Sequence, residues 1–259
     1  MGTIEGKAAL VTGAASGIGA ASARELMARG ARCVIIDVAE EAGHKVAADI
    51  GAVFVAADVG DPDAWDRVVA TVRHELGGLD LAHLNAGVAN IGAVDVTTLP
   101  LEKYRRMMRV NLDGVFFGLR ALVPLMAERG GGHIVVTASI AGLAPFSVDP
   151  VYTATKHAVV GLVRALTSPL SAQGITINAI CPGGVDTPLL RDAIGGVDAP
   201  LPESATIQPP SEVGAAAVEL LESDETGRLD VVLAGRGRVP YTFAPIPTSD
   251  PTVFHTQLG

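Results

Sequence analysis

The residues Thr12-Gly13-Ala14-Ala15-Ser16-Gly17-Ile18-Gly19 decide the fold of this chain. They directly follow the apolar run 8–11 and lead into a helical pattern over 18–29. Glycines placed between a strand and a helix allow a tight turn, a close approach of a pyrophosphate and close packing of the helix on the strand. The helix N-terminus adds unpaired N–H groups and a partial positive charge. We therefore predict a dinucleotide phosphate site, with an ordinary glycine-rich turn as the alternative; its residues would be Gly13, Ser16, Gly17, Ile18 and Gly19.

Short apolar runs rich in β-branched residues alternate with longer helical patterns along the chain. Such alternation implies right-handed crossovers and a parallel, doubly wound sheet with helices on both faces. We expect one α/β domain over residues 1–259, with seven strands in the order 3-2-1-4-5-6-7. The expected strands are 8–11, 32–38, 53–57, 79–84, 134–138, 176–180 and 231–233, and the expected helices are 18–29, 40–49, 62–76, 101–128, 151–170 and 211–221.

Prolines and glycines interrupt this rhythm in two segments. Residues 188–210 contain Gly195-Gly196 and five prolines, which predicts a mobile lid over the substrate. Residues 240–259 carry further prolines and are expected to be irregular. Pro124 and Pro169 fall inside helical patterns and should kink or end those helices.

Composition excludes several classes of protein. The 259 residues are 49% hydrophobic but only 4% aromatic, which predicts an aliphatic core, and the net charge of −9 argues against a nucleic-acid partner. Cys33 and Cys181 lie on strands expected on opposite sides of the sheet, so we predict free thiols and a reducing compartment.

The N-terminal residues lack a signal-peptide pattern and no uninterrupted apolar run approaches the ~20 residues of a membrane span. We expect a cytoplasmic protein with no membrane partner and, since its six histidines lack ligand spacing, no metal.

Asp37 ends the second expected strand, where a carboxylate can accept hydrogen bonds from the ribose hydroxyls of an adenosine. It would repel a 2′-phosphate, and neither Ala15 nor Val38 supplies a cation for one. This favours NAD over NADP. The alternative is a solvent-facing Asp that caps the next helix.

Tyr152 and Lys156 stand four residues apart within a helical pattern. At this spacing the two side chains share a helix face about 5–6 Å apart, so the ammonium should lower the pKa of the phenol. That would bring Tyr152 toward the range useful for general acid–base catalysis. Ser139 follows the fifth strand at its carboxyl end, where it could converge with Tyr152 on a substrate oxygen.

Together these motifs resemble the short-chain dehydrogenase/reductase superfamily, in its compact single-domain form, over residues 7 to about 190. The resemblance rests on Thr12 to Gly19, Asp58-Val59, Asn85-Ala86-Gly87, Asn111, Ser139, Tyr152-x-x-x-Lys156 and Pro182-Gly183-Gly184-Val185-Asp186-Thr187. It implies that Tyr152 is the acid/base, Ser139 orients the carbonyl, and Lys156 binds the nicotinamide ribose. It also implies that Asn111 holds a water in a proton relay.

The resemblance further implies a set of cofactor contacts. Asp58 and Val59 would contact the adenine, and residues 85–87 would lie along the adenosine ribose. The carboxamide would be held by residues 182–187, with the Val185 backbone as partner. The expected cofactor-binding residues outside the glycine turn are Asp37, Asp58, Val59, Asn85, Ala86, Gly87, Val110, Tyr152, Lys156, Pro182, Gly183, Val185 and Thr187.

Two departures from the family pattern concern the fourth strand and the C-terminal end. Leu84 stands where family members commonly have a first Asn, and residues 234–241 replace the usual Gly-rich, aspartate-containing end. Because of the second departure, the family pattern does not predict the substrate pocket or the subunit contacts. Family members are usually dimers or tetramers, so a homo-oligomer is expected.

The predicted substrate is a largely apolar secondary alcohol or ketone. Apolar side chains stand before Tyr152 and at the start of the expected lid, where Arg191 alone could serve a charged substrate. Two alternatives stay open: an NADP-dependent carbonyl reductase, and a non-catalytic sensor that binds NAD. The expected apolar lining is Ala141, Leu143, Ala144, Phe146, Val148, Leu189 and Leu190.

Overall fold

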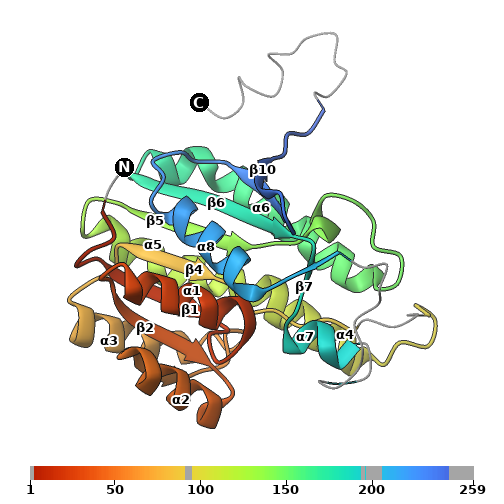
Figure 1. The fold of residues 1–259 in the computed structure, drawn as a ribbon, viewed down its shortest axis with the longest axis horizontal. Coiled ribbons are helices and arrows are strands. Elements are labelled where there is room, and N and C mark those ends of the chain that lie inside the picture. Colours follow the sequence, from red (N-terminus) through yellow and green to blue (C-terminus); the bar gives the residue numbers. More distant parts are fainter. Residues whose placement is uncertain (1–2, 91–94, 194–195, 197–205, 245–259) are drawn as a thin grey trace.

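A computed structural model describes residues 3–90, 95–193, 196 and 206–244, and they form a central sheet flanked by helices (Figure 1). The sheet has eight strands in the order β10-β9-β6-β5-β4-β1-β2-β3. Two short strands, β7 (Gly184–Val185) and β8 (Ile207–Gln208), pair separately. The strands of the main sheet are β1 (Ala8–Thr12), β2 (Arg32–Asp37), β3 (Val53–Ala56), β4 (Leu81–Leu84), β5 (Gly132–Thr137), β6 (Ile175–Pro182), β9 (Leu229–Leu233) and β10 (Gly237–Pro240).

The first seven of these main-sheet strands are parallel and follow the predicted order, so the doubly wound fold is confirmed. Buried aliphatic side chains form one cluster on each face of the sheet, as parallel strands between two helical layers require. The sheet also separates the cysteines: Cys33 on β2 and Cys181 on β6 are free and buried, as predicted.

The predicted strand count of seven is wrong, because the chain turns back after β9 and adds β10 as an antiparallel edge strand. Gly235 and Gly237 have positive φ angles of 69° and 63°, which a tight reversal favours. The expectation of irregular structure from Pro240 onward also fails at that residue, which ends β10. A proline is tolerated there because an edge strand leaves one row of backbone groups unpaired. Residues 241–244 have no regular structure, and the rest of the predicted tail lies outside the described residues.

The helices lie close to their predicted positions. Pro124 lies inside α5 (Gly114–Ala127) and Pro169 inside α6 (Pro150–Ser171), and each helix continues for a few residues beyond its proline. The expected helix 101–128 is divided by a π-helical turn, η1 (Arg109–Asp113). The remaining elements are α1 (Gly17–Ala28), α2 (Glu40–Ile50), α3 (Ala64–Leu76), α4 (Leu101–Met108), α5 (Gly114–Ala127), η2 (Ile140–Gly142), α6 (Pro150–Ser171), α7 (Pro188–Ala193) and α8 (Pro210–Leu221).

The helical stretch Leu101–Ala127 is long and apolar enough to cross a membrane by length and composition alone. Its second half packs into the main core cluster through Leu119, Leu122 and Leu125. A core helix satisfies the same criteria, and we interpret the stretch as one.

The segment predicted as a lid is only partly described. It begins with α7 and ends with β8 and the start of α8, whereas 194–195 and 197–205 lie outside the described residues. Its closure over a substrate stays a prediction.

Candidate active site

The turn between β1 and α1 depends on its glycines. Gly13 and Gly17 have φ angles of 63° and 54°, in the left-handed region that favours glycine. A Cβ on Gly19 would lie 2.1 Å from the carbonyl oxygen of Gly13 and 2.7 Å from Asn85 Nδ2. The turn therefore needs glycine at 13 and 17 for its backbone conformation and at 19 for close backbone packing.

The N-terminus of α1 has the features of an anion site. Among the described residues, the Ser16 hydroxyl caps none of the helix N–H groups, and no acidic side chain occupies the first turn. These N–H groups are left for a ligand, and the helix dipole favours a negative one. Ser16, Gly17 and Ile18 thus fit the pyrophosphate of a dinucleotide.

Asp37 lies at the carboxyl end of β2, beside this turn. Its carboxylate oxygens accept hydrogen bonds from the backbone N–H groups of Ala15 and Ala39, each at 3.0 Å. Asp37 is not the helix cap considered as an alternative, because α2 begins after Ala39. The adjacent Val38 side chain is exposed and apolar, so it supplies no cation for a 2′-phosphate.

A network of threonine and asparagine side chains joins the carboxyl ends of β1, β4 and β5. The Thr12 hydroxyl accepts hydrogen bonds from the N–H groups of Asn85 and Ala86, at 2.9 and 3.1 Å. The Asn85 side chain donates to the carbonyl oxygens of Thr12 and Gly13 and accepts from the Thr137 hydroxyl at 3.0 Å. Sequence reasoning missed Thr12 and Thr137 as supports of the site. Their position at strand ends facing the site is the only signal that could have indicated them.

Asp58 and Val59 follow β3 on the side of the sheet expected to hold the adenine. The Asp58 carboxylate forms an ion pair with Arg109 and accepts a hydrogen bond from the N–H of Gly60 at 2.9 Å. The carbonyl oxygen of Val59 accepts from the Trp65 indole at 3.0 Å. Arg109 was not among the predicted site residues.

Asn111 is fully buried in the π-helical turn, next to the partly buried Val110. Its Oδ1 accepts from the N–H of Val88 at 2.8 Å, and its Nδ2 donates to the Val88 carbonyl and to the Thr155 hydroxyl, at 2.9 and 3.1 Å. A Cβ on Gly87 would lie 3.5 Å from both Asn111 Oδ1 and Lys156 Nζ. Asn111 therefore clamps the loop after β4 to α6, close to Lys156. Its expected role in a water relay stays a prediction.

Ser139, Tyr152 and Lys156 meet at the carboxyl end of β5. The Ser139 hydroxyl accepts from the N–H of Ala141 at 3.1 Å and hydrogen-bonds with the Tyr152 side chain. The Lys156 ammonium lies 5.6 Å from the centre of the Tyr152 ring and donates to the carbonyl oxygen of Thr137 at 2.8 Å. The structure thus brings the predicted serine, tyrosine and lysine together.

The pKa values of this group differ from the prediction that Lys156 lowers that of Tyr152. Burial raises the pKa of Tyr152 to about 12, against a lowering effect of the hydrogen bond with Ser139. Burial also lowers the pKa of Lys156 to about 8. The predicted direction is wrong for the protein by itself, because desolvation of the phenolate outweighs its stabilisation by neighbouring groups.

The segment 182–187 crosses the end of the site. Its backbone is fixed by hydrogen bonds from the N–H of Gly183 to Val232 and from the N–H of Asp186 to Gln208. The Thr187 hydroxyl donates to the carbonyl oxygen of Val185 at 3.3 Å. Pro182, Gly183, Val185 and Thr187 thereby lie on one ordered segment that begins at the carboxyl end of β6.

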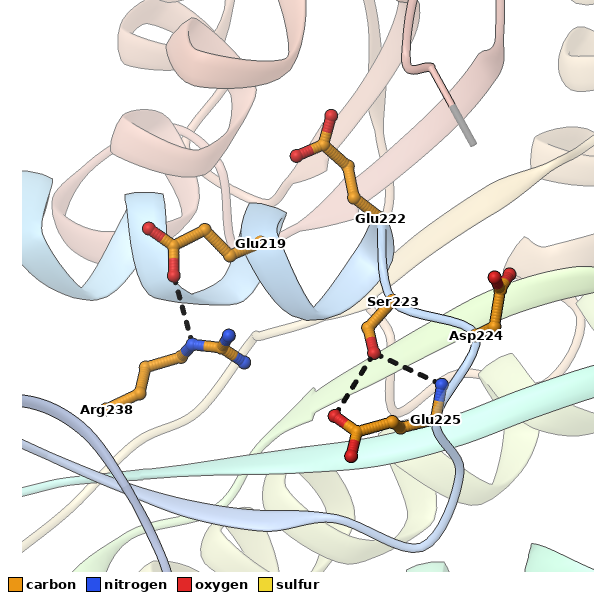
Figure 2. A pocket seen from close by; sticks show the side chains of 6 residues that line it. All are labelled: Glu219, Glu222, Ser223, Asp224, Glu225 and Arg238. Atoms are coloured by element: carbon orange, nitrogen blue, oxygen red, sulfur yellow. Dashed lines mark hydrogen bonds and ion pairs between the residues drawn. The ribbon is translucent and has the colours of Figure 1, made fainter. Parts of the chain in front are cut away.

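A hollow of about 530 Å³ lies away from these residues, between the end of α8 and the start of β9 (Figure 2). The hollow lies at the amino ends of the parallel strands, whereas Ser139 lies at their carboxyl ends. Ligands of open α/β sheets bind at the carboxyl edge, so we do not assign the catalytic site to this hollow. Its lining residues are Glu219, Glu222, Ser223, Asp224, Glu225 and Arg238.

A doubly wound sheet with a glycine turn after β1 and a serine–tyrosine–lysine group at its carboxyl edge defines an oxidoreductase that binds a nicotinamide dinucleotide. Comparison with known proteins agrees: the model of the short chain dehydrogenase family matches residues 7–195. The chain belongs to this family, as the sequence motifs indicated.

Two curated relatives and one solved structure illustrate the likeness. A 3-alpha-(or 20-beta)-hydroxysteroid dehydrogenase of Mycobacterium tuberculosis is 42% identical over 190 residues, 73% of this chain and 72% of the relative. A 2,5-dichloro-2,5-cyclohexadiene-1,4-diol dehydrogenase of Sphingobium indicum is 36% identical over 230 residues, 85% and 92% of the two chains. The crystal structure of a 3-ketoacyl-(acyl-carrier-protein) reductase from Brucella melitensis, complexed with NADH, superposes with a TM-score of 0.81 at 30% identity and covers 90% of this chain and 99% of that one. The chain is thus an oxidoreductase of alcohol and carbonyl groups.

Proposed function

We propose that this protein interconverts a secondary alcohol on a carbocyclic ring and the corresponding ketone, with NAD(H) as cofactor. The observation that carries the proposal is the hydrogen-bonded pair of Ser139 and Tyr152, with the Lys156 ammonium one helical turn away. Two hydroxyl groups and a cation placed in this way can hold one substrate oxygen and exchange one proton with it.

In the direction of oxidation, the substrate hydroxyl hydrogen-bonds to Ser139 and Tyr152. The phenolate of Tyr152 accepts the hydroxyl proton as the hydride leaves the carbinol carbon and the C–O bond becomes a double bond. A bound NAD⁺ would supply the hydride acceptor, and its positive charge would also favour the phenolate. Lys156 lies 5.6 Å from the Tyr152 ring and favours the phenolate in the same sense, while its bond to Thr137 fixes the ammonium.

In the reverse direction the protonated Tyr152 gives its proton to the carbonyl oxygen. Since burial raises the pKa of Tyr152 to about 12, the protonated form dominates at neutral pH. Reduction should therefore be supported at neutral pH and below. Oxidation should accelerate as the pH rises toward about 8, where Lys156 begins to lose its charge.

Asp37 supports the choice of NAD over NADP. Its carboxylate is fixed by two backbone N–H groups at the end of β2, where the adenosine ribose is expected. A 2′-phosphate there would face this negative charge, which costs several kcal/mol at a low effective dielectric. The neighbouring Val38 offers no compensating charge.

Exposed apolar side chains beside Ser139 support a carbocyclic substrate. Ile140, Phe146 and Val148 expose 41%, 37% and 39% of their surface, which is unusual for large apolar residues in one short segment. Relatives whose names include a steroid and a cyclohexadiene-diol favour a ring-borne hydroxyl. The expected lid residues Leu189 and Leu190 would extend the apolar surface.

A steady-state assay on a panel of cyclic and linear alcohols with NAD⁺ and NADP⁺ tests this proposal. We expect kcat/KM to be highest for cyclic alcohols with NAD⁺. The variant Tyr152→Phe should lower kcat by at least about a thousandfold while the dissociation constant of NADH, measured by fluorescence, stays within about threefold. Asp37→Ala should reduce the preference for NAD⁺; an unchanged NAD/NADP ratio would contradict the assignment of Asp37. Binding of NADH without turnover of any substrate would instead identify a sensor.

A further inference from the structure

Asp149 is a fully buried carboxylate at the N-cap of α6, three residues before Tyr152. One of its oxygens accepts a hydrogen bond from the N–H of Tyr152 at 2.9 Å. The other accepts from the N–H of Asn90 at 2.8 Å, in the loop that follows β4. One side chain therefore binds the first turn of the catalytic helix and a loop distant in sequence.

We propose that Asp149 is a positioning residue of the active site, which holds the loop after β4 against α6 and sets the electrostatic environment of the Tyr152 hydroxyl. This inference rests on the function proposed above. A capping aspartate alone would need only the first of its two hydrogen bonds, and most capping residues are at the surface.

The geometric part of the proposal follows from a second clamp on the same loop. Asn111 binds both backbone groups of Val88 and the Thr155 hydroxyl, whereas Asp149 binds Asn90 and the N–H of Tyr152. The loop is thus attached to α6 at two points, one before and one after the Tyr152 side chain along the helix. Gly87, at the start of this loop, lies against Lys156, so movement of the loop would disturb the catalytic group.

The electrostatic part follows from the charge of Asp149. Within the described part of the chain, both hydrogen-bond donors to its carboxylate are backbone N–H groups. They carry no net charge, so the field of the carboxylate is only partly offset. Among the described residues, the other polar groups beside Tyr152 are Ser139 and Lys156, and Cys181 on β6 interacts with Lys156. Burial and the negative charge of Asp149 raise the pKa of Tyr152, and the hydrogen bond with Ser139 lowers it.

Two substitutions separate the charge of Asp149 from its hydrogen bonds. Asp149→Asn removes the charge and keeps an oxygen that can accept one of the two N–H groups, whereas Asp149→Ala removes both. For Asp149→Asn we expect the pH profile of kcat to move about one pH unit to lower pH, with kcat at the optimum within about threefold of the wild type. For Asp149→Ala we expect the same shift and, because the loop is released, a fall of roughly ten- to a hundredfold in kcat with a smaller change in KM.

Asp61→Asn is the matched control, because the exposed Asp61 carboxylate also accepts a hydrogen bond from a backbone N–H, that of Asp63. It should leave the pH profile unchanged. If both Asp149 variants keep the wild-type profile and lose only thermal stability, Asp149 is a helix cap and the proposal is overturned.

A titration without turnover distinguishes this inference from the proposed function. The absorbance of tyrosinate is followed against pH with NAD⁺ bound, and the same titration of Tyr152→Phe identifies the contribution of Tyr152 among the three tyrosines. A lower transition for Tyr152 in Asp149→Asn supports the inference even if no substrate is turned over. An unchanged transition overturns it even if the enzyme is active.

Discussion

Gly17 in the turn after β1 lies directly against Thr187, on the segment that follows β6. A methyl group on the Gly17 Cα would lie 3.0 Å from Thr187 Cγ2 and 3.9 Å from the ring of Pro188. The expected phosphate turn and the expected carboxamide segment therefore touch. A dinucleotide that spans the site would be enclosed between them.

This contact predicts the effect of Gly17→Ala. The alanine would need a φ near 54° and would press on Thr187, so we expect the dissociation constant of NADH to rise at least about tenfold. Gly77→Ala is the control: Gly77 also has a positive φ, 76°, but its Cβ would meet nothing within 4 Å. Both variants should lose about 1 kcal/mol of stability. Equal NADH affinity in the two, measured by fluorescence titration, would contradict a role of Gly17 in binding.

We predict that the buried ammonium of Lys156 lowers the free energy of unfolding at pH 7. Its pKa falls from 10.5 to about 8 on burial, so between these values the unfolded chain binds a proton that the folded protein does not. The contribution of this group to the free energy of unfolding therefore increases as the pH rises from about 8 to 10.5 and is unfavourable at pH 7. Lys156→Met should raise the free energy of unfolding at pH 7 by about 1–2 kcal/mol, after loss of the hydrogen bond to Thr137, and should abolish activity.

Urea unfolding at pH 7 and at about pH 10 checks this prediction. The advantage of Lys156→Met should shrink at the higher pH. Lys45→Met removes an exposed ammonium on α2 and should change stability by less than about 0.5 kcal/mol at either pH. A less stable Lys156→Met at pH 7 would mean that the ammonium stabilises the fold.

His83 on β4 is predicted to make the fold sensitive to acid. It is fully buried, its Nε2 is bonded to the Thr137 hydroxyl at 2.8 Å, and its Nδ1 has no partner within the described part of the chain. Burial lowers its pKa from 6.5 to about 3, so the unfolded chain binds one more proton between these values. Stability is therefore lost as the pH falls from 6.5 toward 3, by up to about 1.4 kcal/mol per pH unit.

The variant His83→Val should weaken the pH dependence of the free energy of unfolding by the contribution of one bound proton. The free energy of unfolding is measured between pH 6 and about pH 4. His133 has a lowered pKa from the same cause and should leave part of the slope in place. An unchanged slope in His83→Val would show that His83 is protonated in the folded protein.

Arg238 is predicted to hold the additional strand β10 on the sheet. Its guanidinium binds the fully buried carboxylate of Asp230 and that of Glu219, each at 3.0 Å. Arg238→Ala leaves Arg228 as the one cation paired with Asp230 among the described residues. We expect a loss of about 1–2 kcal/mol in the free energy of unfolding and faster hydrogen exchange in β10. Arg236→Ala, in the exposed turn of the same hairpin, should have neither effect.

The order of the first seven main-sheet strands and the identity of the serine, tyrosine and lysine followed from the sequence alone. Periodicity and the glycine turn are local properties, and right-handed crossovers leave few topologies for alternating strands and helices. The spacing of Tyr152 and Lys156 likewise determines their proximity, because a helix places residues four apart on one face.

Tertiary structure alone decided the ionisation of Tyr152 and the role of Asp149. The sequence places Lys156 one turn from Tyr152, and this predicted a lowered pKa. Burial reverses the direction, because desolvation depends on every element packed around the phenol. The bond of Asp149 to Asn90 and the bonds of Thr12 and Thr137 to Asn85 likewise join segments that are distant in the sequence. Hydrogen bonds between segments far apart in the chain form only once the sheet has brought those segments together, so no local sequence pattern predicts them.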